Sequence, residues 1–332
     1  MSKKLLFKLV ALVAAMMCAL GTMAQEAYVN FTPEDSTLTF YFDNLRSSRS
    51  GTTYDLNTES NPPEWNKPGI YYYLTRVVFD PSFADARPTS TYQWFHIMIK
   101  LESITGMQYL NTSEVTNMGY MFSGCIALTS LDLSNFNTAN VTIMDCMFLS
   151  CSGLTSLDLS SFNTANVTRL YSMFAGCYGL TSLDLSNFNT AKVISMENMF
   201  RSCTSLTTIY AGDEWSTAAV SQSNNMFTGC TNLVGGKGTT YDENYVDVAY
   251  AHIDGGPSNP GYFTEKVDFL RGDVDSDGSV NISDVTTLID YLLSGNASGV
   301  NLSAADCDQD GSVNISDVTT LIDYLLGGSW PN

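Results

Sequence analysis

Basic residues are scarce in this sequence. The chain of 332 residues has 15 lysines and arginines against 34 aspartates and glutamates, which gives a formal net charge of −19. Nucleic-acid phosphates are bound by clustered lysine and arginine side chains, so this imbalance argues against a nucleic-acid partner. Charged residues are only 15% of the chain, but hydrophobic residues make up 44% and aromatic residues 12%, which is typical of a globular protein rather than a disordered one.

Long hydrophobic runs are absent after the first two dozen residues, so we expect no transmembrane span after the leader. The leader itself has an apolar run from Leu9 to Leu20, small residues at Thr22 and Ala24, and a basic start at Lys3, Lys4 and Lys8. These features predict that residues 1–24 are a signal peptide cleaved after Ala24, and that the protein is secreted. A lipoprotein anchor at Cys18 is the alternative, but Met17 before it is bulky where a small residue is required.

Groups that carry out catalysis are also few. His96 and His252 are the only histidines, and they lie far apart in the sequence. The chain has no nucleophile elbow, no phosphate loop and no zinc-ligand spacing. We therefore expect that the protein is not an enzyme.

The cysteines follow a period rather than the pattern of a disulfide framework. Four of them recur every 26 residues and a fifth follows after 27, namely Cys125, Cys151, Cys177, Cys203 and Cys230. Five Met-Phe pairs share this period, beginning at Met121-Phe122, and repeats of about 20–29 residues are typical of leucine-rich solenoids. Each recurring cysteine is either a buried thiol facing its copy in the next coil or part of a disulfide between coils; we favour buried thiols, because like positions pair awkwardly. Cys146 lies outside this register.

Each repeat predicts one coil of an α/β solenoid. Leu128, Leu131 and Leu133 match the leucine-rich pattern, in which a short parallel strand buries its leucines. Asn137-Thr138 predicts a turn, because such side chains bond to local backbone. Apolar residues from Val141 to Met147 have helical spacing, which predicts a short helix or helical turn on the outer side.

An acidic stripe follows the strands. Asp132, Asp158 and Asp184 occupy one strand position in successive coils, and Tyr210 takes that position in the next. The first interpretation is a solvated surface that maintains solubility, and the second is a face that binds a protein or glycan ligand. Glycosidase chemistry is disfavoured, because these carboxylates share one repeated environment and catalysis needs two different ones.

The repeat, with its string Met-Phe-x-x-Cys-x-x-Leu-Thr-Ser-Leu-Asp-Leu-Ser-x-Phe-Asn-Thr, resembles the BspA-like leucine-rich-repeat surface proteins of bacteria. The resemblance implies leucine-rich repeats over residues 101–232, between an N-terminal cap at 25–100 and a C-terminal cap at 233–266. Caps are expected, because an open solenoid end would expose core and strand edges. The family implies an extracellular binding and adhesion surface without catalysis.

The composition changes in the tail, residues 267–332, where two acidic segments of 12 residues begin 33 residues apart, at Asp273 and Asp306. Calcium takes about six to eight oxygen ligands, and a 12-residue loop supplies them from fixed positions. The predicted ligands for two calcium ions are Asp273, Asp275, Asp277, Ser279, Asn281 and Asp284, then Asp306, Asp308, Asp310, Ser312, Asn314 and Asp317. Gly278 and Gly311 occupy the sharp turn at position 6, and position 12 is aspartate where an EF-hand has glutamate.

A helix is predicted after each loop. Val285, Leu288, Ile289 and Leu292 are spaced as one helical face that ends at Gly295, and the second helix repeats this pattern up to Gly327. Two loop-then-helix units of this kind resemble the type I dockerin module of bacterial extracellular assemblies, a small all-α calcium-loop domain. The resemblance implies a cohesin-type partner, which would contact loop positions 10 and 11, here Ile282, Ser283, Ile315 and Ser316.

The sequence is consistent with two functions. The first is a secreted or cell-surface binding protein of a bacterium, with a solenoid for ligand recognition and a calcium-folded tail for docking. The second is an accessory component of an extracellular polysaccharide-degrading assembly, in which the solenoid binds glycan or a neighbouring enzyme.

Overall fold

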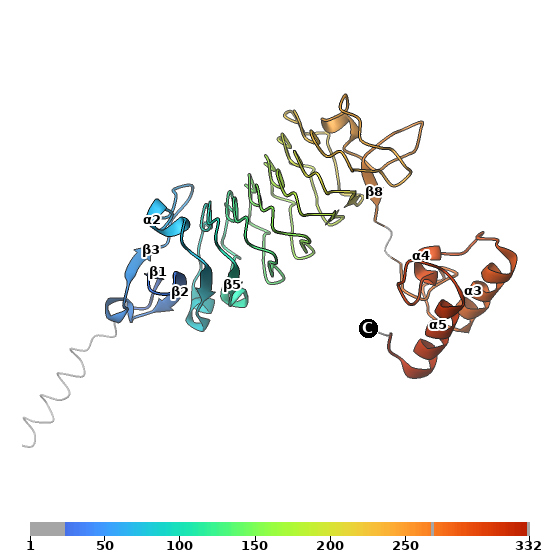
Figure 1. Ribbon diagram of the computed structural model, residues 1–332, viewed down its shortest axis with the longest axis horizontal. Coiled ribbons are helices and arrows are strands. Elements are labelled where there is room, and N and C mark those ends of the chain that lie inside the picture. Colours follow the sequence, from blue (N-terminus) through green and yellow to red (C-terminus); the bar gives the residue numbers. More distant parts are fainter. Residues whose placement is uncertain (1–23, 267–268, 331–332) are drawn as a thin grey trace, which may run out of the picture. The chain divides into compact units, whose positions relative to one another are not determined.

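The computed structural model describes residues 24–266 and 269–330, so the expected signal peptide lies outside the described residues except for Ala24. The chain divides into two compact units between Lys266 and Val267. The first is rich in strands and turns, and the second is helical (Figure 1). No helix among the described residues is long and apolar enough to cross a membrane.

A five-stranded sheet opens the first unit and sets the direction in which the coils stack. Its order is β3-β1-β2-β4-β5, with β1 antiparallel to β2 and β3 but β4 parallel to both β2 and β5. The antiparallel hairpin thereby changes into a parallel array, as the repeat requires. The strands are β1 (Glu26–Thr32), β2 (Thr37–Asp43), β3 (Thr52–Asp55), β4 (Arg76–Phe79) and β5 (Ser103–Thr105).

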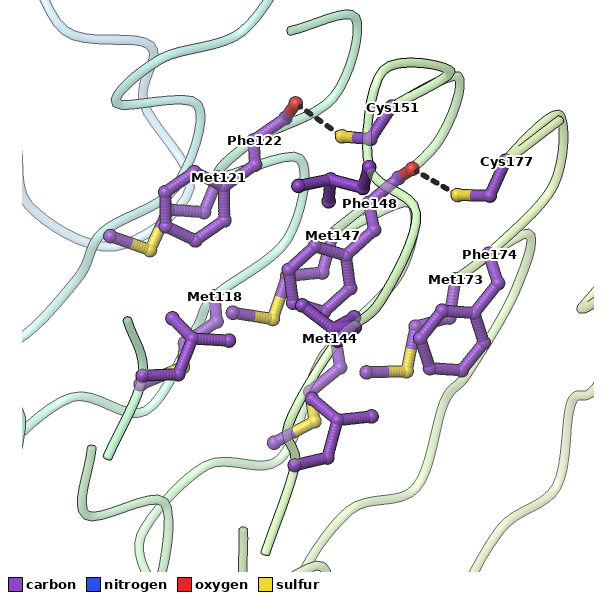
Figure 2. Close-up of a cluster of buried hydrophobic side chains, with 14 of the residues drawn as sticks. Met118, Met121, Phe122, Met144, Met147, Phe148, Cys151, Met173, Phe174 and Cys177 are labelled. Carbon is purple, nitrogen blue, oxygen red and sulfur yellow. Dashed lines mark hydrogen bonds between the residues drawn. The ribbon is translucent and has the colours of Figure 1, made fainter. Parts of the chain in front are cut away.

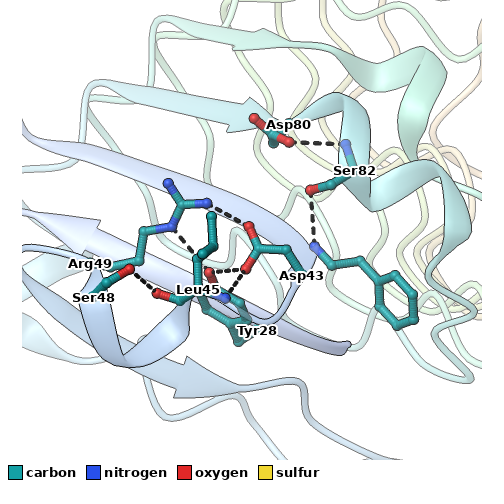
Figure 3. A network of polar contacts seen from close by, with 8 residues as sticks. Tyr28, Asp43, Leu45, Ser48, Arg49, Asp80 and Ser82 are labelled. Carbon is teal, nitrogen blue, oxygen red and sulfur yellow. Dashed lines mark hydrogen bonds and ion pairs between the residues drawn. The ribbon is translucent and has the colours of Figure 1, made fainter. Parts of the chain in front are cut away.

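A polar network ties this sheet together at the end of β2 (Figure 3). The Asp43 carboxylate accepts a hydrogen bond from the Tyr28 hydroxyl at 2.7 Å and one from the Leu45 N–H at 2.8 Å, and it pairs with the Arg49 guanidinium. The Ser82 hydroxyl accepts the N–H of Phe42 at 3.2 Å. These contacts join β1 and β2 to the 3-10 helices η1 (Arg46–Ser48) and η2 (Pro81–Asp85).

Beneath the sheet lies an aromatic core centred on Phe40. Its ring stacks on Phe79 with centroids 4.5 Å apart and on Trp94 at 4.9 Å, and it meets Trp65 edge-on at 5.7 Å. Both indoles are held by hydrogen bonds, since Trp65 Nε1 donates to the Trp94 carbonyl at 2.8 Å and Trp94 Nε1 donates to Asn57 Oδ1 at 2.6 Å. The short helix α2 (Pro68–Tyr71) contributes the buried Ile70 to this core.

Successive coils are joined by a repeated set of backbone hydrogen bonds, which we call the coil ladder. The N–H groups of Met118, Tyr120, Phe122 and Gly124 donate to carbonyls 25 residues later at 2.7–3.0 Å. Parallel bridges mark the same ladder at Ser90, Asn117, Ile143, Arg169, Ser195 and Gln222. The ladder therefore begins at Ser90, inside the segment expected to be the N-terminal cap.

Of the two alternatives predicted for Val141–Met147, the short helix is wrong, and the structure has consecutive hydrogen-bonded turns that begin in this segment. Two residues in each coil have left-handed backbone, for example Cys146 at φ 56° and Ser150 at φ 59°. A residue with left-handed backbone interrupts a right-handed helix. Alternate N–H groups therefore donate to carbonyls of the next coil instead of carbonyls of their own coil. Val141, Met144 and Met147 are nevertheless fully buried in the core.

The leucine side of the coils is less regular than expected. Apart from β5 in the first coil, only the last coils form strands there, in the parallel order β6-β7-β8, with β6 (Ser182–Leu185), β7 (Thr208–Ala211) and β8 (Phe263–Glu265). Leu128 and Leu133 are buried without a strand around them, and Leu131 is partly buried. The hydroxyl of Thr138 links coils here, because it donates to the Asn163 carbonyl and accepts the Asn163 N–H, both at 2.8 Å.

Phenylalanine rings form a continuous stack through the coils (Figure 2). The centroids of Phe122, Phe148, Phe174 and Phe200 are 5.7–5.8 Å apart from one coil to the next, and their planes are nearly parallel. Methionines of the same coils lie beside the rings. Because each ring is fully buried only by its neighbours, a coil depends on the coils on both sides of it.

The recurring cysteines are thiols, and none of the described cysteines forms a disulfide. Each Sγ donates to the carbonyl of a phenylalanine in the preceding coil at 2.9–3.1 Å, as Cys151 does to Phe122. Burial raises the pKa of the Cys151 thiol well above its usual value. Cys146 is also buried, but it stands at a different repeat position, the left-handed one that Tyr120 and Ser172 occupy in the neighbouring coils.

Thiol titration tests this arrangement. We expect the seven cysteines from Cys125 onward to be unreactive toward a disulfide reagent in the folded protein, because they are buried and protonated. All seven should react after unfolding in denaturant without reductant. A smaller number of thiols in the denatured, unreduced protein would show that coils are cross-linked.

The closing segment of the first unit is organised around Asp254. Its buried carboxylate accepts hydrogen bonds from the N–H groups of Lys237, Thr239 and Gly256 and from the Thr239 hydroxyl, at 2.8–3.0 Å. Burial alone would raise the pKa of Asp254, but these hydrogen bonds outweigh it and hold the pKa well below its usual range. The 3-10 helix η4 (Val248–Tyr250) lies in the same segment.

Replacing Asp254 by asparagine should therefore destabilise the first unit by about 2–3 kcal/mol, because an amide NH2 would face backbone N–H groups. A carboxylate with a lowered pKa in the folded state stabilises above the unfolded pKa of about 4, and this stabilisation is lost as the pH falls below it. Thermal unfolding measured as a function of pH should show that Asp254→Asn loses less stability on acidification than the unchanged protein does. The control is Asp247→Asn at an exposed helix cap, where asparagine is an equally good acceptor; an equal effect of both changes would contradict this role for Asp254.

The tail contains two long helices, and both predicted helices are confirmed. They are α3 (Ile282–Ser294) and α5 (Ile315–Gly327), each begun by an asparagine cap and ended by a left-handed glycine. The left-handed glycine that caps α5 is Gly328 rather than the expected Gly327, which restores the 33-residue spacing from the capping Gly295 of α3. A short helix that the sequence reading missed, α4 (Leu302–Ala305), precedes the second loop.

The core of the tail differs from the predicted helical face at two positions. Val285 and Leu288 are buried, but Ile289 and its counterpart Ile322 are exposed. Trp330 adds a contact from beyond α5, since its ring stacks on Tyr324 at 3.9 Å and the Arg271 guanidinium lies 4.6 Å from the ring. Trp330, near the end of the tail, is thus held against Arg271, near its beginning.

Candidate functional site

The first acidic loop lies between Asp273 and α3. One carboxylate oxygen from each of Asp273, Asp275 and Asp277 lies within 4.8 Å of the others, close enough to share one cation. Backbone N–H groups orient these side chains, because Asp277 N donates to Asp273 Oδ1 at 2.9 Å and Gly278 N donates to Asp273 Oδ2 at 3.0 Å. Gly278 has φ 88°, which confirms the sharp turn at this position.

The second loop repeats the arrangement with one difference. Here the clustered oxygens come from Asp306, Asp308 and Asp317, again within 4.8 Å. Asp306 Oδ1 is buried and has no hydrogen-bond partner among the described residues. An unpaired buried carboxylate oxygen is costly, and a bound cation would satisfy it, so this loop fits an ion.

The aspartate at position 12 closes each loop onto its helix. Both Asp284 oxygens are hydrogen-bonded, Oδ1 to the N–H of Val274 at 2.7 Å and Oδ2 to the N–H of Asn281 at 2.8 Å. The Asp275 N–H also donates to Asp284 Oδ1 at 3.1 Å, and Asp317 accepts the equivalent N–H groups of Asp308 at 3.1 Å and Asn314 at 2.8 Å. Burial raises the pKa of Asp284 despite these hydrogen bonds, so a nearby cation would favour its ionised form.

The other predicted ligands are placed beside the clusters. Asp310 belongs to the second loop but is outside its cluster, and its N–H donates to Asp308 Oδ1 at 3.1 Å. Asn281 and Asn314 cap α3 and α5 through their side-chain oxygens, a helix-capping role in addition to the predicted one. Ser279 and Ser312 lie on the exposed part of each loop.

The predicted docking residues separate into two kinds. Ile282 and Ile315 are 68% and 70% exposed, which is unusual for isoleucine at the start of a helix. The Ser283 hydroxyl instead donates to Asp275 Oδ2 at 2.7 Å, and Ser316 makes the equivalent contact with Asp308. The serines therefore help to hold the loops as well as lying next to the exposed isoleucines.

Family comparisons divide the chain as the structure does. Residues 271–326 match the dockerin type I domain. Residues 89–157 and 155–240 match a family described as Mycoplasma protein of unknown function, DUF285. The start of that match at residue 89 coincides with the start of the coil ladder at Ser90. No curated protein and no solved structure matches the chain.

The aspartates of the acidic stripe in the first unit form mainly local hydrogen bonds and an ion pair. Asp132 accepts the Ser134 N–H at 3.1 Å and the Ser134 hydroxyl at 2.7 Å, and these hydrogen bonds lower the pKa of Asp132. Asp184 pairs with Lys266 at 2.9 Å, and the Lys266 ammonium also lies 5.2 Å from the centre of the Tyr210 ring. Asp184 on β6 and Tyr210 on β7 lie side by side at the end of the stripe. Lys266, from the closing segment, therefore occupies this end.

A second candidate surface was missed from the sequence. A groove of about 410 Å³, which we call the polar groove, runs along the coil ladder. The helical spacing of this segment predicts a short helix or helical turn, and neither brings these side chains together in one groove. The available signal was the polar or aromatic character that recurs at two positions of the repeat, as at Asn117 and Arg169 and at Asp145, Tyr171 and Glu197, all of which line the groove.

Proposed function

We propose that this chain is a non-catalytic binding protein, secreted or held at a bacterial cell surface, whose tail folds around two calcium ions and docks to a cohesin-type partner. The observation that carries this proposal is the pair of acidic loops, each with carboxylate oxygens clustered within 4.8 Å. The dockerin type I match over the same segment supports it. Asp273, Asp275, Asp277 and Asp284 would hold one ion, and Asp306, Asp308, Asp310 and Asp317 the other, with the Ser279 and Ser312 carbonyls and the Asn281 and Asn314 side chains completing the ligand sets.

The first unit is proposed to be a BspA-like leucine-rich-repeat solenoid that recognises an extracellular protein or glycan. Its repeated coils, buried leucines and stacked phenylalanines support this classification. Titratable groups in the core, such as the recurring thiols, are buried and protonated, which favours a structural role for them.

Exposed apolar side chains support docking through the tail. Each long helix has three of them on one face at helical spacing, although such residues are ordinarily buried. They are Ile282, Ile289 and Leu293 on α3, and Ile315, Ile322 and Leu326 on α5. Because the two sets are equivalent, a partner is proposed to bind either half of the tail.

The alternative function is an accessory component of an extracellular polysaccharide-degrading assembly, with a role in polysaccharide catabolism. The dockerin type I match favours an assembly of some kind. A glycan ligand of the first unit would favour this alternative, and a matrix-protein ligand would favour adhesion.

Chelation tests the calcium loops. Removing calcium leaves four aspartates in each loop without a counter-ion, so the tail helices should lose much of their far-ultraviolet circular dichroism signal. The strand and turn signal of the first unit should persist. An unchanged spectrum after chelation, or equal recovery with magnesium alone, would contradict calcium-dependent folding.

Substitution of the exposed isoleucines tests docking to a type I cohesin by calorimetry. Ile282→Ala alone should weaken binding only about twofold, because the second half still offers its own site. Ile282→Ala with Ile315→Ala should weaken it about tenfold or more. The matched control is Asp290→Asn with Asp323→Asn, both exposed on the same helices. Equal loss from the single and double isoleucine changes would contradict two equivalent orientations.

A further inference from the structure

The polar groove crosses successive coils and is therefore elongated. Its floor follows the row of parallel bridges, in which Asn117, Ile143, Arg169 and Ser195 succeed one another from coil to coil. Parallel strands are spaced about 4.8 Å apart, so three coil steps extend roughly 14 Å. A groove of about 410 Å³ with this length suits a short linear molecule better than a single ion.

A fixed ion pair lies in the middle of the groove. The Asp145 side chain is only 9% exposed, pairs with Arg169 at 2.6 Å and accepts the Tyr171 N–H at 3.0 Å. Arg169 itself is half-exposed. A guanidinium has five N–H donors in a rigid plane, so Arg169 can donate to a ligand while Asp145 holds it in place.

Ser195 adds a polar group that the protein leaves unsatisfied. The residue is buried, and its hydroxyl has no hydrogen-bond partner among the described residues. Leaving a buried hydroxyl unpaired is unfavourable, and a ligand hydroxyl at the groove would remove this cost. Glu197 and Gln222 lie beside it in the groove and supply an acceptor and an amide.

Tyrosines line the groove from several coils. Tyr92 and Tyr120 meet edge-on with centroids 5.9 Å apart, and Tyr171 follows two coils later. Tyrosine combines an apolar ring with a polar hydroxyl, which suits a ligand that has both C–H faces and hydroxyl groups. Gly119 leaves room here, because a Cβ at this position would lie 3.3 Å from the Tyr92 ring.

The charges of the groove exclude a strongly charged ligand. The groove lining has one arginine, Arg169, and two acids, Asp145 and Glu197, and the whole chain has a net charge of −19, which repels polyanions. Protein interfaces centre on buried apolar anchors and their pockets, whereas Ile143 is the single aliphatic side chain along this groove. We propose that the polar groove binds a neutral oligosaccharide, with Arg169, Ser195 and Glu197 contacting its hydroxyls and the tyrosines its sugar rings. This inference rests on the proposed recognition function of the first unit.

Calorimetry on the full chain with calcium tests the proposal, using neutral hexasaccharides of β-linked glucose, mannose and xylose as probes and polygalacturonate as a charged comparison. At least one neutral probe should bind. Tyr171→Ala with Glu197→Ala should weaken that binding roughly tenfold or more. Asp132→Asn with Asp158→Asn, on the acidic stripe, is the matched control and should leave it unchanged. Gln222→Ala, at an exposed groove residue, is the second groove variant if the first lowers the thermal stability.

The results separate this inference from the function on which it rests. Absence of binding to all three neutral probes, binding that the groove variants retain, or a preference for polygalacturonate would overturn the groove assignment. A panel of extracellular-matrix proteins is titrated in parallel. A matrix protein whose binding is lost only in the acidic-stripe variant would leave recognition intact but place it on the other face, whereas chelation tests the tail independently of either outcome.

Discussion

The first unit depends on backbone hydrogen bonds that run from each coil to the next. In an ordinary helix, backbone N–H groups donate to carbonyls of the same helix. Here the N–H groups of Met118, Tyr120 and Phe122 donate to carbonyls of the following coil. Left-handed residues at two positions per coil make this possible, since they turn the backbone outward at the right places. The stacked phenylalanines and the thiol-to-carbonyl contacts lie along the same ladder, so burial and hydrogen bonding reinforce one another.

The tail follows a different principle, in which closely spaced carboxylates shape the loops. Asp284 and Asp317 are buried, and their oxygens bond the N–H groups of the loop that precedes them. The loops nevertheless gather more negative charge than these N–H groups neutralise, which is why a cation fits the structure. The two halves are not identical, because Asp306 keeps an unpaired buried oxygen and Trp330 stacks on Tyr324 of the second helix only.

Two faces of the first unit now have distinct characters. The acidic stripe consists of residues engaged in local turns, and Lys266 is paired at its end, so its charge is partly neutralised by the protein itself. The polar groove instead contains an ion pair between the buried Asp145 carboxylate and the half-exposed Arg169, and an unsatisfied hydroxyl, with tyrosine side chains in the same lining. This contrast favours the groove as the place where a ligand would gain the most from binding.

The amino-acid sequence alone determined the 26-residue repeat, the buried leucines, the two acidic loops and the helices that follow them. These features depend on spacing, and spacing is visible in one chain: Gly278 and Gly311 occupy turns with positive φ as expected, and Cys151 is a buried thiol. The tertiary structure decided which face of each coil carries the hydrogen-bonded ladder, that Ile289 is exposed, and that Asp145, Arg169 and Ser195 meet in one groove. Helical spacing in Val141–Met147 resembles that of an amphipathic helix, and only the position of the next coil shows that its N–H groups have partners outside their own turn.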